Sequence, residues 1–247
     1  MAGHSKWHNI KIRKGKQDAQ RSRMFTRYAR EIIVAAKSGG DIDANARLRL
    51  AVENARGGGM GKDAIERNIK KGTGEWESES YEEATFEGYG PGGVAVMAAI
   101  LTDNRRRTVG ELRTLFSRNG GSPGDAGSVS WMFSNKGIIL IPAGEADQDR
   151  VLDIAVEAGA EDVVEDAGVL EVRTPPGALE AVRTALQAHD IPITSADLTM
   201  VPQTTVRLEG REAEQCLRLM EALEEYPDVQ RVFANFDLPE ELIEAAA

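Results

Sequence analysis

The 247-residue chain carries 30 Lys and Arg residues against 40 Asp and Glu residues, which gives a formal net charge of −10. Its single cysteine, Cys216, excludes an internal disulfide framework and a cysteine-rich zinc site, and is typical of a reducing compartment. No stretch approaches the roughly 18 apolar residues of a membrane span, and the N-terminus lacks an apolar signal core. We therefore expect a cytoplasmic protein, not bound to a membrane, built as one large domain or as two or three small ones.

The charge is unevenly distributed along the chain. Residues 1–72 hold 17 basic and 7 acidic side chains, a net charge of 17 − 7 = +10, whereas residues 73–247 hold 13 and 33, a net charge of 13 − 33 = −20. Most of the positive charge lies between Gly3 and Lys37, where ten basic residues accompany two acids. A basic arm on an acidic body points to a polyanion partner, most often nucleic acid.

A run of charge can also be no more than a solvated helix face. In this arm, however, four basic residues fall within six positions, where their mutual repulsion has no internal compensation: Lys11, Arg13, Lys14 and Lys16. A phosphate backbone would compensate it, and binding should then depend steeply on salt. The predicted contacts in the arm are Lys6, Trp7, Lys11, Arg13, Lys14, Lys16, Arg21 and Arg23.

The spacing of apolar residues predicts three helices in the basic region. Met24, Tyr28 and Ile32 belong to an apolar stripe over residues 17–37, and shorter stripes cover 43–56 and 63–72, with glycine-containing turns between them. We expect residues 1–72 to form a helical N-terminal domain. Residues 73–81 are acidic and unpatterned, and we expect a linker that lets this domain move relative to the rest.

From residue 84 the apolar pattern changes to that of strands. We predict strands at 85–88 and 94–101, a helix at 108–118 and a strand at 129–133, and after residue 203 a strand at 205–208, a helix at 212–225 and a strand at 229–235. The C-terminal elements alone would bury little apolar surface. We therefore expect residues 82–134 and 203–247 to share one sheet in an α/β domain.

Between these two segments the predicted elements follow the order βαββαβ, which is the ferredoxin-like arrangement. The strands are expected at 137–142, 162–165, 169–173 and 198–201, and the helices at 148–158 and 177–188. Residues 135–202 would then be an inserted domain, although pairing of consecutive elements would instead give two sequential domains. The expected fold class is multidomain α+β, with a three-helix domain, an α/β middle domain and a ferredoxin-like domain inserted into it.

The candidate motifs for catalysis or cofactor binding lack the neighbouring elements or residues that their chemistry requires. The glycines of residues 88–93 satisfy a dinucleotide fingerprint, but they lie between two strands with no helix to present to a pyrophosphate. Residues 57–62 resemble a phosphate loop, but Asp63 replaces the Ser or Thr that would bind magnesium. His4 and His8 lack nearby cysteines or carboxylates to complete a metal site. We expect no enzyme, no metal and no cofactor.

A second basic cluster lies on the acidic body, where a predicted strand ends and a helix begins. It has the sequence NRRRT at residues 104–108. Guanidinium groups beside helix N-terminal amides suit phosphate, so Arg105 and Arg107 are secondary candidate contacts, with a structural ion-pair role as the open alternative. In the arm, Trp7 could stack on an unpaired base or pack into the helical domain.

Several separated motifs resemble the signatures of the YebC/PmpR family. They are GHSKW at 3–7, RKGKQD at 13–18, YEE at 81–83, EGYGPGG at 87–93, TDNR at 102–105 and GSVSWMF at 127–133. The family includes mitochondrial translational activators of cytochrome oxidase subunit I. The resemblance implies a three-domain, cytoplasmic, non-enzymatic protein. It implies either regulation of transcription through DNA binding or action on the ribosome, as a translation factor that relieves stalling at proline-rich stretches. The chain departs from the family pattern at Gly59, Gly61, Arg106 and Pro123.

Charge alone does not separate duplex DNA from ribosomal RNA as the partner. The arm has Gly15 in its middle and no recognition helix with base-reading Asn or Gln, which favours an adaptable contact with irregular RNA. A protein-interaction adaptor is the alternative, in which the acidic ferredoxin-like domain binds a basic protein. The sequence leaves the oligomeric state open.

Overall fold

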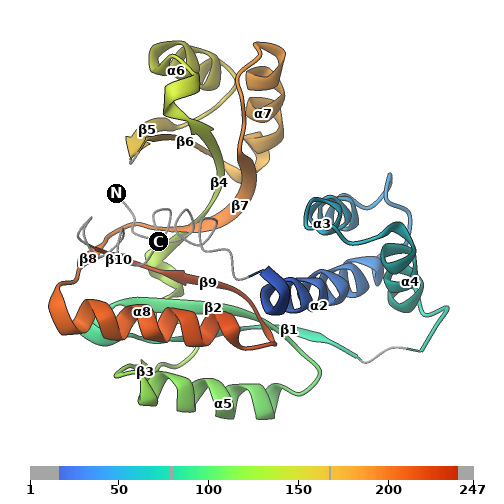
Figure 1. Cartoon of the computed structure of the whole chain (residues 1–247), viewed down its shortest axis with the longest axis vertical. Helices are drawn as coiled ribbons and strands as arrows, with labels where there is room; N and C mark the ends of the chain where they lie inside the picture. The colour runs from blue at the N-terminus through green and yellow to red at the C-terminus, as the bar shows by residue number, and fades with distance from the viewer. Residues whose placement is uncertain (1–16, 78–79, 167, 239–247) are drawn as a thin grey trace.

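The computed structural model describes residues 17–77, 80–166 and 168–238. The chain is a multidomain α+β protein in which a central sheet with its helices carries a ferredoxin-like unit above it and a helical unit at its side (Figure 1). The predicted fold class is therefore confirmed, while the residue boundaries of the three domains stay a prediction.

The helical unit consists of α2 (Gln17–Ala36), α3 (Ala46–Gly57) and α4 (Lys62–Gly72), as predicted. Asn45 caps α3, because its side chain accepts a hydrogen bond from the backbone N–H of Leu48 at 3.0 Å. The three helices bury one apolar core at their junction, which includes Ile32, Leu48 and Ile65. The stripes read from the sequence are thus the faces that pack together.

The central sheet has the strand order β3-β1-β2-β9, with β1 (Glu82–Tyr89), β2 (Ala95–Thr102), β3 (Ser122–Pro123) and β9 (Val229–Ala234). The pairing of β2 with β9 joins the two sequence segments in one sheet. A short 3-10 turn, η1 (Pro91–Gly93), connects β1 to β2. Helices α5 (Arg105–Arg118) and α8 (Gly210–Glu225) cover one face of the sheet, and their core includes Phe116 and Leu219.

The inserted unit has the predicted order βαββαβ. Its elements are β4 (Phe133–Pro142), α6 (Gln148–Glu157), β5 (Asp162–Asp166), β6 (Val169–Thr174), α7 (Leu179–Ala188) and β7 (Ser195–Pro202), with the short turns η3 (Ala143–Glu145) and η4 (Pro176–Ala178). The strands form an antiparallel sheet ordered β5-β6-β4-β7. After it, β8 (Val206–Arg207) pairs in parallel with β10 (Phe236–Asp237), and the chain returns through α8 and β9 to the central sheet.

Strand β2 is apolar from Ala95 to Leu101, and both of its faces are covered. One face packs under α5 and α8, while Ala95 and Met97 on the other face join Phe133 and Phe233 in a separate cluster at the base of the inserted unit. A strand buried on both faces reads as a continuous apolar run. This cluster attaches the inserted unit to the central sheet, together with a hydrogen bond that Arg231 of β9 donates to the Leu198 carbonyl of β7 at 2.7 Å.

The predicted strand at 129–133 is wrong. Residues 130–132 form the 3-10 turn η2 (Ser130–Met132), and the strand β4 begins only at Phe133. The backbone N–H groups of Gly127, Val129 and Ser130 donate to the Glu87 carboxylate at 2.8 to 2.9 Å, so they are not available to a neighbouring strand. Burial raises the pKa of Glu87, but these hydrogen bonds outweigh it and leave the pKa below its usual value.

Candidate nucleic-acid interface

The structure places only part of the predicted contact set. Six of the predicted residues lie outside the described part of the chain: Lys6, Trp7, Lys11, Arg13, Lys14 and Lys16. Arg21 lies in α2, but its side chain is also outside the description. Arg23, Arg105 and Arg107 can be placed, and they lie in three different environments.

Arg23 belongs to a row of α2 arginines that faces the C-terminal end of α8. Its guanidinium forms an ion pair with the Glu225 carboxylate at 3.0 Å. One turn later, Arg27 donates a hydrogen bond to the backbone carbonyl of Glu224. Burial lowers the pKa of Arg27. Because residues four apart share one helix face, a single side of α2 makes these contacts.

The contacts of this row stabilise the end of α8. The last carbonyls of a helix lack partners within it, and the helix dipole places partial negative charge there, so cations are favourable at this position. Arg30 extends the row by donating to the carbonyl of Pro227 at 2.7 Å, just beyond α8. The helical unit is therefore held against the central unit by arginines of α2.

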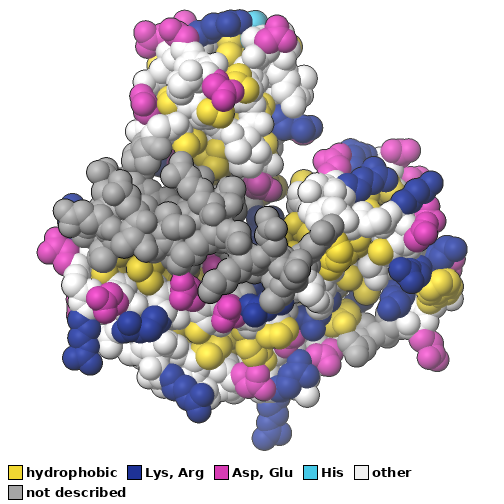
Figure 2. Space-filling model, viewed as in Figure 1, with side chains coloured by type: hydrophobic (Ala, Val, Ile, Leu, Met, Phe, Trp, Pro, Cys, Tyr) yellow, Lys and Arg dark blue, Asp and Glu magenta, His cyan; other side chains and the backbone are white. Residues whose placement is uncertain are grey.

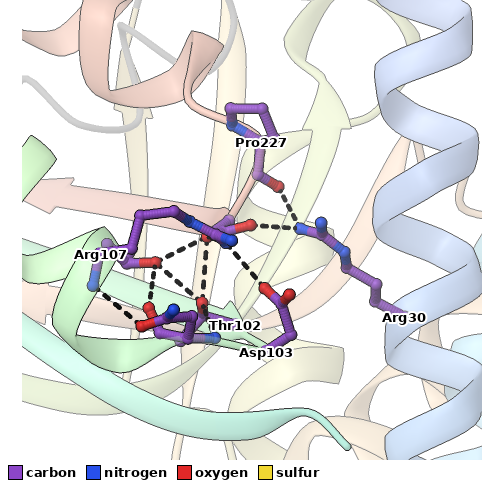
Figure 3. A network of polar contacts seen from close by, with 8 residues as sticks. Arg30, Thr102, Asp103, Arg107 and Pro227 are labelled. Atoms are coloured by element: carbon purple, nitrogen blue, oxygen red, sulfur yellow. Dashed lines mark hydrogen bonds and ion pairs between the residues drawn. The ribbon is translucent and has the colours of Figure 1, made fainter. Parts of the chain in front are cut away.

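Asp228 is the point where this row meets α5. Its side chain is only 3% exposed, and the carboxylate accepts hydrogen bonds from Arg30 at 2.9 Å, Arg107 at 2.8 Å, Thr108 at 2.7 Å and Thr102 at 3.1 Å (Figure 3). Burial raises the pKa of Asp228, but hydrogen bonds from Thr108, Arg107 and Thr102 and the charge of Arg30 lower it below its usual value overall. One buried carboxylate thus links α2, β2 and α5.

Arg107, a predicted secondary contact, is therefore engaged within the chain. Besides Asp228, it forms an ion pair with Asp103 at 2.7 Å, one helical turn before it. Its backbone N–H donates to the side chain of the N-cap residue Asn104, so α5 begins three residues earlier than predicted. In this structure Arg107 has the structural ion-pair role that the sequence left open.

Arg105 lies in a different setting. Together with Arg106, Val109, Gly110 and Arg113 it lines a shallow, open hollow on α5. All three arginines are exposed, and within the described part of the chain no ion pair or hydrogen bond engages their guanidinium groups. Sequence reasoning did not select Arg106 and Arg113, although their seven-residue spacing places them on one helix face.

The surface in Figure 2 shows where the charges gather. Lys and Arg side chains line the right side, where the helical unit lies, and project from the lower edge, where α5 lies. Acidic side chains are spread over the inserted unit and between these two regions. On this face, basic side chains of the helical unit and of the lower edge of the central unit are accompanied by others at the top of the inserted unit.

The end of the predicted linker is held by the helical unit. Lys37 donates to the carbonyl of Tyr81 at 2.9 Å, and the Arg30 guanidinium lies 5.3 Å from the centre of the Tyr81 ring. Arg47 forms an ion pair with Glu83 at the start of β1. The structure thus shows contacts at the C-terminal end of the predicted linker, and the movement of the helical domain relative to the rest stays a prediction.

The described part of the chain also bears on a metal site, a membrane-spanning helix and a reactive cysteine. Among the described residues, no cluster of three His, Cys, Asp or Glu side chains is suited to a metal ion, and no described helix is long and apolar enough to cross a bilayer. Cys216 is buried in α8, and burial raises its pKa to about 12. This thiol is therefore a protonated core residue.

Comparison with known proteins identifies the family. Residues 5–75 match the model of the TACO1/YebC N-terminal domain, and residues 81–236 match that of the TACO1/YebC second and third domains. A protein of Syntrophotalea carbinolica is 53% identical, over 98% of this chain and 97% of its own length. A protein of Desulforapulum autotrophicum is 49% identical, over 99% of this chain and its own full length. Both are named "probable transcriptional regulatory protein".

A solved structure agrees with these matches. The crystal structure of a conserved hypothetical protein from Aquifex aeolicus shares 44% sequence identity with this chain and superposes with a TM-score of 0.81. The similarity covers 93% of this chain and 96% of the Aquifex protein. The sequence motifs, the family models and the fold agree, and the chain belongs to the TACO1/YebC family.

Proposed function

We propose that this protein is a non-enzymatic regulatory factor of gene expression that acts in the cytoplasm and binds nucleic acid through its basic N-terminal arm. The observation that carries the proposal is the separation of charge, with +8 between residues 3 and 37 and −20 over residues 73–247. The names of the full-length relatives support a regulatory role. The arm would bind phosphates, while the acidic body would limit contact to the arm and to local basic surfaces.

The proposed contacts are those predicted from the sequence, and the structure suggests an order among them. Lys6, Trp7, Lys11, Arg13, Lys14, Lys16 and Arg21 form the primary set. Arg23 and Arg107 have partners within the chain, so they would have to exchange ion pairs to reach a phosphate. Arg105 has no such partner among the described residues, which supports it as the secondary contact.

The partner is proposed to be either DNA, as the relatives' names suggest, or ribosomal RNA. An arm with Gly15 at its centre suits irregular RNA better than a regular groove. A role as a transcriptional regulator would require contact with DNA at defined loci. A role as a translation factor that relieves stalling at proline-rich stretches would require contact with the ribosome.

The test is co-sedimentation of the full chain with ribosomes, and in parallel its retention on immobilised duplex DNA. The variant Lys11→Ala/Arg13→Ala/Lys14→Ala/Lys16→Ala should lose binding to the true partner, because four phosphate contacts are removed. Its matched control is the substitution to Ala of four basic residues of the acidic body: Lys136, Arg150, Arg183 and Arg211. Unchanged binding of the arm variant at moderate salt would overturn the proposal and favour a protein-interaction adaptor.

A further inference from the structure

Helix α5 concentrates the basic charge of the acidic body. Its 14 residues hold five arginines and one acid, Glu111, a net charge of 5 − 1 = +4, although residues 73–247 together carry −20. Five of the 13 basic residues in that region therefore lie on one helix. Such a local excess over an opposite background is the electrostatic pattern of a polyanion contact.

The fold separates the charges of α5 onto two sides. Arg107 faces Asp103 and Asp228, and Glu111 is hydrogen-bonded to Tyr226, so this side is engaged by the chain itself. With about 100° between successive residues, the positions that line the hollow fall on the other side of the helix. They are Arg105, Arg106, Val109, Gly110 and Arg113. The three guanidinium groups beside the hollow are thus separated from the carboxylates of the same region.

Gly110 supplies an observation independent of charge. Glycine inside a helix is less favourable than alanine, so its presence needs a reason. Some described glycines, such as Gly72 and Gly88, allow close packing, whereas a Cβ atom at Gly110, in the interior of α5, would meet nothing within 4 Å. Its φ angle is also not in the left-handed region. Packing and backbone conformation therefore do not explain this glycine, whereas the approach of a ligand to the hollow would.

We propose that this α5 hollow, formed by Arg105, Arg106, Val109, Gly110 and Arg113, binds the sugar-phosphate backbone of the nucleic acid, as a second contact separate from the arm. The inference rests on the proposed function and deepens it. A rise of about 1.5 Å per residue separates Arg105 from Arg113 by about 12 Å, enough to span several phosphates that lie about 3.4 Å apart along a duplex. The open backbone at Gly110 admits the strand between the guanidinium groups.

A nucleic acid fits the hollow better than an acidic protein surface. Stable protein interfaces need a central apolar area that excludes water. Here the only large apolar side chain that lines the hollow is Val109, and the surrounding groups are charged and exposed. Charge-assisted contacts to phosphate oxygens need no such apolar area and suit the guanidinium fork.

The test measures the affinity of the full chain for a fluorescein-labelled single-stranded RNA and for a labelled DNA duplex between about 50 and 200 mM NaCl. The variant Arg105→Gln/Arg106→Gln/Arg113→Gln should reduce the slope of log K against log salt by about 2 on the RNA, at about 0.7 per lost contact. Its control removes three positive charges from the inserted unit: Lys136→Gln/Arg150→Gln/Arg183→Gln. The control should keep the wild-type slope.

A second pair of variants tests the hollow itself without removing an arginine. Gly110→Glu places a carboxylate between the guanidinium groups, and Gly110→Gln has nearly the same size without the charge. Both should fold, because the position is open. Gly110→Glu should weaken binding at least tenfold relative to Gly110→Gln.

The outcomes separate this inference from the proposed function. If the α5 triple variant matches its charge control while the arm variant loses binding, the α5 hollow is not a contact and the proposed function stands. If the triple variant loses binding while the arm variant keeps it, the role of the arm is overturned and the hollow is supported. Normal nucleic-acid binding by the triple variant, with loss of an acidic protein partner instead, would also overturn the inference.

Discussion

Helices α2 and α5 are both rich in arginine, but the fold uses their charges differently. Arg23, Arg27 and Arg30 of α2 bind the end of α8 and the residues that follow it. Arg105, Arg106 and Arg113 of α5 face solvent with no partner among the described residues. The density of positive charge in a sequence therefore does not say which charges remain available to a polyanion, because neighbouring helix ends and buried carboxylates can engage them first.

The largest effect is expected at the carboxylate that joins the two helices. Asp228→Ala would leave Arg30, Arg107 and two threonine hydroxyls without their common partner, and breaking a buried pair in this way costs about 3 to 5 kcal/mol. Urea unfolding followed by circular dichroism would measure the loss. Asp153→Ala on the exposed side of α6 is the control and should change stability little. Equal stabilities of the two variants would contradict the role of Asp228.

A smaller effect should distinguish an engaged arginine from a free one. Arg30→Gln removes hydrogen bonds to Asp228 and to the Pro227 carbonyl, and hydrogen bonds to charged groups contribute about 1.5 to 3 kcal/mol. Arg106→Gln in the α5 hollow should stay within about 0.5 kcal/mol of the wild type. The midpoint of urea unfolding measures both. Equal losses would remove the distinction between the two helices.

The pH dependence of stability should show the same network. The pKa of Asp228 is lowered in the folded state, so the carboxylate stabilises the fold above its unfolded pKa of about 3.9, and this contribution is lost as the pH falls through the folded pKa. Asp228→Asn cannot titrate, and its unfolding midpoint should fall less steeply in acid than that of the wild type. Parallel curves for the two proteins would show that Asp228 does not contribute to acid sensitivity.

The smallest expected effect on stability concerns Gly110 in the α5 hollow. Gly110→Ala should raise the free energy of unfolding by about 0.5 to 1 kcal/mol, because alanine is the better helix former and its Cβ meets no atom. Thermal unfolding would show this as a slightly higher midpoint. A lower midpoint would mean that the glycine has a structural role in the helix.

The order of elements could be predicted from the sequence because it follows from local patterns. The stripes of α2 and α3 and the βαββαβ order of the inserted unit appear in the structure where they were expected. The strand predicted at 129–133 was wrong: Val129, Trp131 and Phe133 alternate as in a strand, but Glu87, about 40 residues away in the sequence, accepts from the backbone N–H groups of Gly127, Val129 and Ser130. A contact of this kind has no local signal.

The candidate site shows the same limit of local information. The basic cluster at 104–108 was recognised, but its division into an engaged Arg107 and a free Arg105 depends on Asp228, which is 121 residues from Arg107. Helical spacing would have added Arg113 to the cluster, since Arg105, Val109 and Arg113 are four residues apart. No pattern in the sequence indicates that the tight turn after α8 holds the carboxylate shared by both helices.

The most direct test of the account is photo-crosslinking of the full chain to nucleic acid in living cells, followed by identification of both the attached nucleotides and the attached peptides. If the basic arm and the α5 hollow make the contacts, the crosslinked peptides should come from residues 6–16 and from α5 around Arg105–Arg113. Crosslinks confined to the inserted unit, at α6 or α7, would contradict the account.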